Sequence, residues 1–361
     1  MNARGKSSSP LPLPDAPHMH AVLLTGQRTV EVGSVPRPWL REPGQVLLRM
    51  AYGGICGSDL HYYRDGRIGD QKVHFPMIVG REGTAEVVEV SDGVRRLRPG
   101  QNVVLDPALV CGSCDQCRAG RANTCRALRF LGSPGGPPGC MAEYLVMPES
   151  CCYPLPPQVN LRQGVLAEPL AIALHTLRLL GGNPPHTMAI LGAGAIGLCL
   201  LAVASVKGVR SICVTDPLQW RCEAAMRLGA EWTGSPATDV VREILGAVPG
   251  GVEVAAECCG EQAALDQALR LLAPGGKLAI VGIPRTNKVS FDINLLRRKD
   301  FSIMNVRRQN ACLPEAIALL AGQLHDLALV THEYPLGEAA GAFAAAAAYE
   351  PGIIKSVIYL Q

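Results

Sequence analysis

The 361-residue chain has few aromatic residues and almost no net charge. Aromatic side chains make up 4% of the sequence, and the formal net charge is +3. These values argue against a stacking platform for single strands and against a charged surface for nucleic acid or membranes. No apolar run is long enough to span a bilayer, and the N-terminus lacks the apolar segment of a secretory signal. We therefore expect a soluble, cytoplasmic protein with a small-molecule substrate.

The sequence has the composition of a globular protein and an unusual supply of cysteine. Hydrophobic residues make up 48% and charged residues 18%, and the length suggests two domains. Residues 1–18 are rich in Ser and Pro, which predicts a flexible tail. The chain has 14 cysteines. In a cytosolic chain a clustered subset of cysteines indicates metal binding more than disulfides.

The chain contains two kinds of sequence pattern, which together predict an α/β protein of two domains. Residues 20–160 contain short apolar or alternating runs between Gly, Pro and Asp, which predict β-strands. Residues 167–182 have helical periodicity, and strands then alternate with helices, which predicts βαβ units and a doubly wound parallel sheet. The texture is mixed from about residue 303. An Ala-rich helix and a closing strand are expected at residues 337–361.

A glycine-rich turn predicts a dinucleotide site. Gly192, Gly194 and Gly197 have G-x-G-x-x-G spacing, after a predicted strand and at the start of a predicted helix. The glycines permit a tight turn, close approach to a pyrophosphate and close helix–strand packing. The phosphate charge would lie at the helix N-terminus. A glycine-rich turn without a cofactor is the alternative.

The next predicted strand supplies the acid that a dinucleotide site requires. Asp216 follows Gly197 by roughly 20 residues and should contact the ribose 2′-hydroxyl. Its carboxylate would repel a 2′-phosphate, which favours NAD over NADP. Arg221 lies close enough to bind a 2′-phosphate, or it covers the adenine. The predicted cofactor site comprises Gly192, Gly194, Ala195, Ile196, Gly197, Asp216, Arg221, Val281, Gly282 and Ile283.

Four cysteines form the clearest metal motif. They have C-x2-C-x2-C-x7-C spacing, and thiolates at such intervals can converge on one tetrahedral ion. With four protein ligands and no open position, the zinc would be structural. Iron–sulfur clusters also use four thiolates, but their usual spacings differ. Chance cysteines in a loop are the alternative. The predicted ligands are Cys111, Cys114, Cys117 and Cys125.

A second group of polar residues suggests a reaction centre. The stretch GGICGSDLHYY supplies Cys56, Ser58, Asp59 and His61 in what we predict is one short loop. A thiolate ligand, a hydroxyl and an imidazole so close together suggest metal binding and proton relay. Taken singly, each has an ordinary structural explanation, such as a small buried hydrophobe for Cys56. Together, in a chain with a dinucleotide site, they favour catalysis.

Two acidic residues complete this candidate centre. Glu82 lies in the stretch MIVGREGTAEVVEV, directly after Arg81, where the local pattern predicts a buried strand. Charged side chains are rarely buried unless they are paired, so this pair is a salt bridge at a strand end or part of a reaction centre. Glu168 lies at the start of the predicted helix in AEPLA. An N-terminal helix acid is the structural alternative for Glu168.

These motifs identify a resemblance that covers residues 19–361. GICGSDLH, the G-x-E-G-x-x-x-V-V-E-V stretch, the cysteine motif, EPLA and GAGAIG with Asp216 resemble the zinc-dependent medium-chain dehydrogenase/reductase superfamily. HYYRDGRIGD, RFLGS and AEPLAIALH are most similar to its polyol branch of sorbitol, xylitol and L-idonate dehydrogenases. The resemblance implies a GroES-like catalytic domain, residues 19–164 with 303–361, and an inserted Rossmann domain, residues 165–302.

The resemblance also implies a reaction and the residues that perform it. The reaction would be NAD-linked oxidation of a secondary alcohol, in which zinc polarises the alcohol oxygen and hydride passes to nicotinamide. Ser58 and His61 would carry the proton away. Arg308, or its neighbour Arg307, matches an arginine that meets substrate hydroxyls and cofactor. A homodimer or homotetramer is implied as well. The matching metal ligands are Cys56 and Glu82, with Glu168 contacting the metal or its water.

One residue departs from the family motif. The family has Gly-His-Glu, whereas this chain has Gly80, Arg81 and Glu82. Arginine stays protonated and has no acceptor lone pair, so it cannot replace the zinc-binding imidazole. At about 4 Å and an effective dielectric near 20, a guanidinium repels a divalent ion by roughly 8 kcal/mol. That rivals much of the roughly 10–16 kcal/mol that a good zinc site supplies.

The departure leaves several possibilities open. Arg81 swings out and zinc is held weakly by Cys56, Glu82 and Glu168, or Arg81 pairs with Glu82, Glu168 or Asp59 and takes the metal's electrostatic place. A degenerate paralogue or an artefact is the third possibility. The leading function is a polyol or sugar-acid dehydrogenase. Threonine- or butanediol-type dehydrogenase activity is an alternative, and a catalytically impaired NAD-binding paralogue is an alternative of another class.

Overall fold

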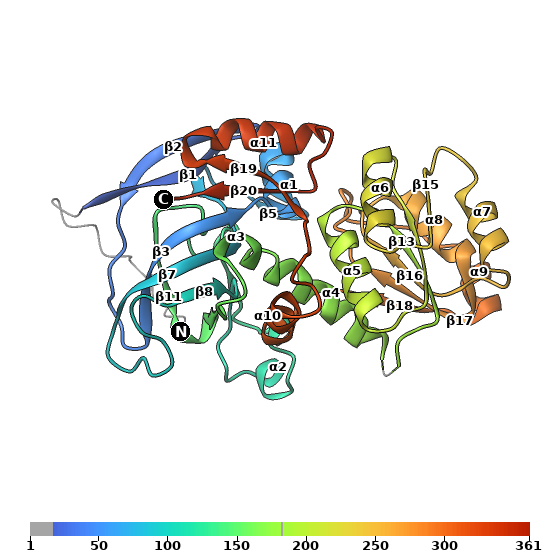
Figure 1. The fold of residues 1–361 in the computed structure, drawn as a ribbon, viewed down its shortest axis with the longest axis horizontal. Helices are drawn as coiled ribbons and strands as arrows, with labels where there is room; N and C mark the ends of the chain where they lie inside the picture. The colour runs from blue at the N-terminus through green and yellow to red at the C-terminus, as the bar shows by residue number, and fades with distance from the viewer. Residues whose placement is uncertain (1–16, 182) are drawn as a thin grey trace, which may run out of the picture.

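A computed structural model describes residues 17–181 and 183–361. The predicted flexible tail, residues 1–18, lies almost entirely outside the described residues. The chain forms two domains that lie side by side along the long axis of the molecule (Figure 1). The first domain contains both the first described residues and the C-terminal strand, and the second is inserted between them. None of the described helices combines the length and apolar character needed to cross a bilayer.

The first domain is built on an antiparallel sheet, as its alternating apolar runs predict. In the described part of the chain, the strands of this sheet have the order β12-β8-β7-β3-β20-β19, and β11 also pairs with β3. β19 and β20 are parallel to each other, and the other pairs are antiparallel. The strands are β3 (Gln45–Gly54), β7 (Glu82–Val90), β8 (Asn102–Leu105), β11 (Tyr144–Pro148), β12 (Cys152–Pro154), β19 (Val330–Pro335) and β20 (Lys355–Tyr359).

Smaller elements surround this sheet. The described residues form a three-stranded sheet, in the order β2-β1-β6, and two short hairpin-like pairs, β4 with β5 and β9 with β10. The strands are β1 (His18–Gly26), β2 (Thr29–Pro36), β4 (Arg67–Ile68), β5 (Gln71–Lys72), β6 (Met77–Ile78), β9 (Ala108–Leu109) and β10 (Arg129–Phe130). The helices are α1 (Gly57–Asp65), α2 (Asp115–Arg118), α3 (Leu161–Gly164), α4 (Ala167–Leu180), α10 (Leu313–Ala321) and α11 (Ala339–Ala348).

The second domain is a parallel sheet in the order β15-β14-β13-β16-β17-β18. This order reverses direction between β13 and β16, and ligands of open α/β sheets bind at such a switch point. Helices cover the sheet (Figure 1). The strands are β13 (Thr187–Leu191), β14 (Ser211–Thr215), β15 (Trp232–Gly234), β16 (Val252–Glu257), β17 (Leu272–Ile280) and β18 (Ser302–Asn305), and the helices are α5 (Ala195–Val206), α6 (Gln219–Arg227), α7 (Val240–Ala247), α8 (Gln262–Leu271) and α9 (Ile293–Lys299).

The domain boundary predicted at residue 303 is wrong. β18 pairs in parallel with β17 through Asn305, so the inserted domain ends after this strand. The prediction failed because SIMN has no turn residue or change of periodicity that separates it from the preceding strands. The predicted Ala-rich helix and closing strand are confirmed as α11 and β20.

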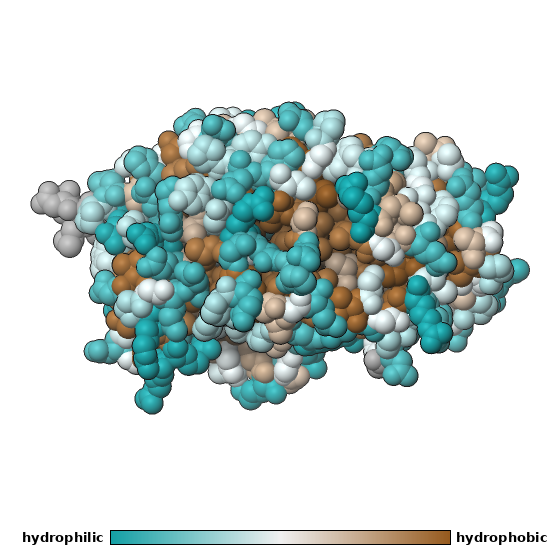
Figure 2. All heavy atoms as spheres, viewed as in Figure 1, coloured by the Kyte–Doolittle hydropathy of each residue, from teal (hydrophilic) through white to brown (hydrophobic). Residues whose placement is uncertain are grey.

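The two domains share a continuous apolar interior. α4 contacts both α5 of the parallel sheet domain and α10, and its buried residues belong to the same core cluster as those of β13 and α5. Figure 2 shows apolar residues gathered along the middle of one face, between the two domains, with charged and polar residues around them. The start of α4, which carries Glu168, therefore lies at the junction where a substrate and a cofactor could meet.

Candidate active site

The residues predicted to lie in one loop after β3 lie on a helix instead. Cys56 is the N-cap of α1, and Ser58, Asp59 and His61 lie on the helix. The Asp59 side chain starts the helix by accepting a hydrogen bond from the backbone N–H of Cys56 at 3.1 Å. This contact is half of a capping box, a helix-start signal that the predicted loop overlooked.

Arg81 is buried in the first domain with its charge paired. Its side chain is 5% exposed, and Nη2 donates to Asp59 Oδ1 and to the carbonyl oxygen of Gly132, both at 2.8 Å. The guanidinium also lies 5.3 Å from the ring centroid of Tyr62 and 5.8 Å from that of Phe130. Burial lowers the pKa of Arg81, but Asp59, together with Cys56 and Tyr62, holds the pKa above its ordinary value. Arg81 is therefore a fixed, buried cation.

The second residue of the charged pair has a different partner. Glu82 Oε2 accepts a hydrogen bond from Lys355 Nζ at 2.6 Å, and both side chains are almost fully buried. Lys355 also donates to the carbonyl oxygen of Ile55 at 3.2 Å. Burial lowers the pKa of Lys355, but the charge and hydrogen bond of Glu82, together with the nearby thiols of Cys56 and Cys199, raise it above its ordinary value. Adjacent residues 81 and 82 thus form two separate ion pairs, and the expected strand-end salt bridge between them is not formed.

Cys56 and Glu168 lie near these ion pairs, in surroundings that disfavour the thiolate and the carboxylate. Burial, followed by the charge of Glu82, raises the pKa of the Cys56 thiol to about 12. The same two causes raise the pKa of Glu168 to about 8. Glu168 Oε2 is buried and has no hydrogen-bond partner among the described residues. The region thus contains a thiol and a protonated carboxyl beside two paired cations.

This arrangement does not fit a catalytic metal. Over residues 17–181 and 183–361, the only metal-ligating group of three or more side chains with ligand atoms within 4.8 Å of one another is the cysteine motif. The ligand atoms of Cys56, Glu82 and Glu168 do not form such a group in the described residues. Glu82 is already bound to Lys355, and Arg81 adds a buried positive charge where the family has an imidazole. Arg81 pairs with Asp59, one of the partners considered from sequence.

The remaining predicted catalytic residues lie on α1 and in the segment after β18. His61 Nδ1 lies 3.4 Å from Asp65 Oδ2, and burial lowers the pKa of the imidazole. Ser58 is partly exposed near the start of the same helix. Arg308 lies 3.6 Å over the Phe130 ring, and its Nη1 is buried without a partner in the described part of the chain. Arg307 is exposed, so Arg308 is the better counterpart of the predicted substrate arginine.

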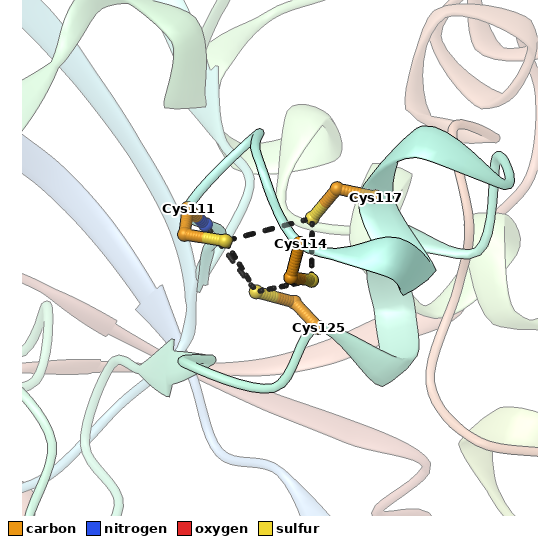
Figure 3. A group of neighbouring side chains, drawn as sticks. All are labelled: Cys111, Cys114, Cys117 and Cys125. Carbon is orange, nitrogen blue, oxygen red and sulfur yellow. Dashed lines mark hydrogen bonds between the residues drawn. The ribbon is translucent and has the colours of Figure 1, made fainter.

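The four-cysteine motif forms a compact sulfur cluster (Figure 3). Four Sγ–Sγ distances within it lie between 3.5 and 4.0 Å. A tetrahedral zinc with Zn–S bonds of about 2.3 Å has sulfur–sulfur edges of about 3.8 Å, so the cluster has the size that zinc requires. Backbone N–H groups of Ser113 and Cys114 lower the pKa of Cys111 to about 6, which favours the thiolate. The cysteines that would hold the zinc are Cys111, Cys114, Cys117 and Cys125.

The dinucleotide turn has the geometry that its glycines predict. β13 ends at Leu191, and α5 begins directly after Gly194. A Cβ atom at Gly197 would lie 1.9 Å from the carbonyl oxygen of Gly192, so only glycine permits this packing of helix against turn. Ala195 and Ile196 form the first residues of α5. The turn therefore leaves the helix N-terminus open to a phosphate.

Asp216 stands at the adjacent strand end, next to this turn. Its Oδ2 accepts a hydrogen bond from the backbone N–H of Ala193 at 2.8 Å, and Arg221 Nη1 lies 3.5 Å from the same oxygen. The Nε of Arg221 is buried with no partner in the described segments. A buried donor without a partner requires an explanation, and a bound ligand is one that the adjoining glycine turn supports. The fit to a dinucleotide therefore rests on the turn, the acid and an unpartnered donor.

The third part of the predicted cofactor site follows β17. Val281, Gly282 and Ile283 lie at the end of that strand, and the backbone N–H groups of Val281 and Gly282 donate to the carbonyl oxygen of Glu257 at 2.8 and 2.9 Å. Glu257 ends β16, which borders the switch point of the sheet. These residues therefore lie at the carboxyl-terminal edge of the parallel sheet, where the glycine turn and Asp216 also lie.

Sequence reasoning missed two residues that shape the pocket. Lys355 neutralises Glu82 from β20, and Gly132 supplies the carbonyl oxygen that accepts from Arg81. Gly132 has a φ of +57°, and a Cβ atom there would lie 2.6 Å from the carbonyl oxygen of Gly80. A lysine inside the apolar strand sequence IIKSVIYLQ was the available signal for a buried partner.

Comparisons with known proteins agree with both domains. The family model described as "Alcohol dehydrogenase GroES-like domain" matches residues 42–157, and the one described as "Zinc-binding dehydrogenase" matches residues 195–322. Sorbitol dehydrogenase of Bacillus subtilis is 32% identical over 345 residues, covering 95% of this chain and 97% of the relative. Probable D-xylulose reductase A of Aspergillus clavatus is 32% identical over 91% of this chain and 93% of its own.

A solved structure gives the same result for the fold. L-idonate 5-dehydrogenase from Escherichia coli superposes with a TM-score of 0.86 at 26% sequence identity, and the match covers 95% of this chain and 98% of that chain. The likeness extends over both domains, because almost the whole of each chain is included.

Proposed function

The chain belongs to the zinc-dependent medium-chain dehydrogenase family, and from this premise we propose that it catalyses NAD-linked oxidation of a secondary alcohol to a ketone. The proposed substrate class is a polyol or a sugar acid. The glycine turn with Asp216 beside it, at the switch point of the parallel sheet, is the observation that carries the proposal. In this reaction the nicotinamide ring accepts a hydride from the carbinol carbon, and the hydroxyl loses a proton.

NAD is the proposed form of the cofactor because of Asp216. Its carboxylate lies where the ribose 2′-hydroxyl of a bound dinucleotide would donate a hydrogen bond, and it would repel a 2′-phosphate. Arg221 is 3.5 Å from that carboxylate, so the arginine charge is already partly neutralised. We therefore expect NAD to bind more tightly than NADP.

Zinc is proposed at the cysteine cluster alone. There the four thiolates hold the lobe of residues 111–125 together and contribute folding energy, as structural zinc sites do. The pocket around Arg81 is proposed to act without a metal, because its cationic charges come from Arg81 and Lys355. One zinc per chain is therefore expected, where the family pattern has two.

Unpartnered polar atoms in this pocket are suited to the hydroxyls of a polyol. Arg81 Nε and Arg308 Nη1 are buried donors, and Glu168 Oε2 is a buried oxygen, each without a partner among the described residues. A hydroxyl both donates and accepts, so a polyol can satisfy donors and acceptor together. In this proposal Arg81 orients and polarises the reacting oxygen, and Ser58 and His61 carry its proton toward solvent.

A guanidinium is a weaker electrophile than zinc, so slower turnover is expected. Zinc lowers the pKa of a bound oxygen strongly, whereas an arginine offers hydrogen bonds and charge without a coordination bond. A second function follows from the same observation: an NAD-binding paralogue without turnover. The two ion pairs that fill the metal position favour this alternative, and the glycine turn supports it equally.

The discriminating experiment is NAD-coupled absorbance at 340 nm with a panel of alcohols. The panel contains hexitols, pentitols, hexonates, a vicinal diol and an amino alcohol, and NAD binding is measured in parallel by calorimetry. Turnover of a polyol or hexonate supports the dehydrogenase. NAD binding without turnover of any substrate identifies the paralogue, and absence of NAD binding contradicts both.

Asp216→Asn provides the cofactor test within the same assay. The amide keeps the shape of the side chain but removes the charge that repels a 2′-phosphate. We expect the preference for NAD over NADP to fall about tenfold, which corresponds to roughly 1.4 kcal/mol. Glu231→Gln, a change of the same kind at an exposed residue in the same domain, should leave the preference unchanged. An unchanged preference in Asp216→Asn would refute the assignment.

A further inference from the structure

A cavity of about 210 Å³ lies beside the Arg81 pocket and is lined by four arginines. None of the described residues that line it is acidic. Arg129 comes from β10, and Arg307 and Arg308 come from the segment that follows β18. Arg126 is the fourth. Segments that lie far apart in the sequence therefore build this basic wall.

Three of the four positive charges are not neutralised by the protein. Arg126 forms an ion pair with Asp115, with Nη2 at 2.8 Å from Oδ2. In the segments that the structure describes, Arg129, Arg307 and Arg308 have no acidic partner within 4.0 Å. Burial and the neighbouring charges of Arg307 and Arg81 lower the pKa of Arg308 to about 10. Like charges gathered without counter-charges raise the free energy of the empty cavity and favour a bound anion.

The basic wall is held in place by contacts between these separate segments. Asn123 Nδ2 donates to the carbonyl oxygen of Arg307 at 3.0 Å, and Arg308 stacks over the Phe130 ring. Arg308 also has a φ of +56°, a left-handed conformation that costs free energy in a residue with a side chain. Such strain is retained where the surrounding structure fixes a functional side chain. Arg308 is thus a positioned residue, whereas Arg126, Arg129 and Arg307 line the cavity from exposed positions.

The cavity adjoins the proposed reaction pocket. Ser133 lines the cavity, and its hydroxyl accepts a hydrogen bond from Arg81 Nη1 at 3.4 Å. Phe130 also lines the cavity and contacts both Arg81 and Arg308. A chain-like substrate with one hydroxyl beside Arg81 can therefore extend another group toward the basic wall. A water molecule occupies about 30 Å³ in the liquid, so the cavity has room for a carboxylate or a phosphate.

The cofactor's own phosphates do not account for this charge. They are expected at the glycine turn between β13 and α5, and neither that turn nor Asp216 contributes to the described lining of the cavity. We propose that the substrate carries an anionic group, a carboxylate or a phosphate, which binds to Arg129, Arg307 and Arg308 while a hydroxyl along its carbon chain reacts. This inference rests on the proposed function and narrows its substrate class.

The kinetic test compares a neutral hexitol with a hexonate and a hexitol phosphate in the NAD-coupled assay. Wild-type protein should show kcat/KM at least about tenfold higher for one of the anions, chiefly through KM, and added salt should reduce this preference. The preferred anion distinguishes a carboxylate site from a phosphate site. Equal kcat/KM for neutral and anionic substrates would overturn the inference.

Variants assign the preference to the cavity. Arg129 and Arg307 are both exposed, so the fold should tolerate their replacement by glutamine. Arg129→Gln and Arg307→Gln are each expected to reduce the ratio of kcat/KM for anionic substrates to kcat/KM for neutral substrates about tenfold. Arg98→Gln is the matched control, because Arg98 is exposed and lies outside the cavity lining. A ratio that stays constant in both cavity variants, or that falls equally in the control, contradicts the site.

A binding measurement separates this inference from the proposed function. Titration of the NAD-loaded protein with a hexonate or inorganic phosphate is followed by calorimetry, with the double variant of Arg129→Gln and Arg307→Gln beside it. Binding that the double variant loses, without turnover of any alcohol, supports the anion site and refutes the dehydrogenase. Turnover of neutral polyols without anion binding supports the dehydrogenase and refutes the anion site.

Discussion

Two regions of the first domain were predicted from the family motifs to be metal sites, and their side chains are arranged differently. In the cysteine lobe, four Sγ atoms lie at the spacing of a zinc tetrahedron. In the pocket around Arg81, the corresponding positions are filled by two buried ion pairs, Arg81–Asp59 and Glu82–Lys355. The lobe is partly exposed, whereas all four side chains of the ion pairs are nearly inaccessible to solvent.

In the proposed function, the fold retains the pocket while Arg81 and Lys355 supply the positive charge that a metal would supply. A buried carboxylate needs a cation, and a metal ion, a lysine or an arginine can each supply one. Replacing the histidine by Arg81 removes a ligand and adds a positive charge in the same step. The scaffold remains intact because Asp59 on α1 and the carbonyl oxygen of Gly132 accept the guanidinium. The proposed function therefore separates the structural metal site of this domain from the reactive one.

Replacing a predicted metal-binding cysteine should change the zinc content very differently in the two regions. Cys114→Ser is expected to reduce bound zinc from about one per chain to nearly zero and to unfold the lobe, because a structural zinc supplies roughly 10–16 kcal/mol. Zinc is measured by mass spectrometry of the purified protein, and unfolding by circular dichroism during heating. Cys56→Ser, at the second region, should leave zinc content unchanged. A parallel loss of zinc in Cys56→Ser would place metal in the Arg81 pocket.

Breaking the buried ion pair should be the next largest effect. Arg81→Met leaves the fully buried Asp59 carboxylate without its cation, which is expected to reduce the free energy of unfolding by roughly 3–5 kcal/mol. The measurement is equilibrium unfolding in urea, in buffer with and without zinc.

Two controls show whether burial is the cause. Adding Asp59→Asn to Arg81→Met removes both charges and should recover most of the loss. Arg49→Gln breaks an ion pair with Glu86 whose side chains are 47% and 33% exposed, and it should cost less than about 1 kcal/mol. Equal losses for Arg81→Met and Arg49→Gln would contradict the buried pairing.

The pH dependence of stability should report on Glu168. Burial and the Glu82 charge raise its pKa to about 8, so the folded state keeps a proton that the unfolded state releases near pH 4.5. Stability therefore falls as pH rises from about 4.5 to 8, at roughly 1.4 kcal/mol per pH unit. Glu168→Gln lacks this titration, and its free energy of unfolding should depend less on pH between 6 and 8. Parallel pH curves for wild type and variant would refute the raised pKa.

Local sequence patterns were sufficient to predict most of the fold. Alternating runs predicted the antiparallel strands, and the change to strand–helix alternation predicted the parallel sheet. The glycine turn and the cysteine spacing were predictable because each depends on a short segment and on one backbone geometry. The helix α1 was missed because its start depends on the Asp59–Cys56 capping contact, which lies within a glycine-rich stretch that resembles a loop.

The active-site pairing could not be predicted in the same way. Sequence alone left Asp59, Glu82 and Glu168 as possible partners of Arg81, and the fold selects Asp59. Lys355 lies 273 residues after Glu82, and only the pairing of β20 with β3 brings the lysine beside the glutamate. The basic cavity likewise depends on tertiary structure, because Arg307 and Arg308 lie far from β10 in the sequence and only the fold brings these segments together.

Zinc stoichiometry tests the central distinction between the two regions most directly. The native protein, expressed with zinc and freed of loosely bound metal by gel filtration, is analysed by inductively coupled plasma mass spectrometry beside Arg81→His. One zinc per native chain is expected, together with a gain toward two in Arg81→His, because the imidazole restores a ligand and removes a charge. Two zincs per native chain would contradict replacement of the catalytic metal by Arg81.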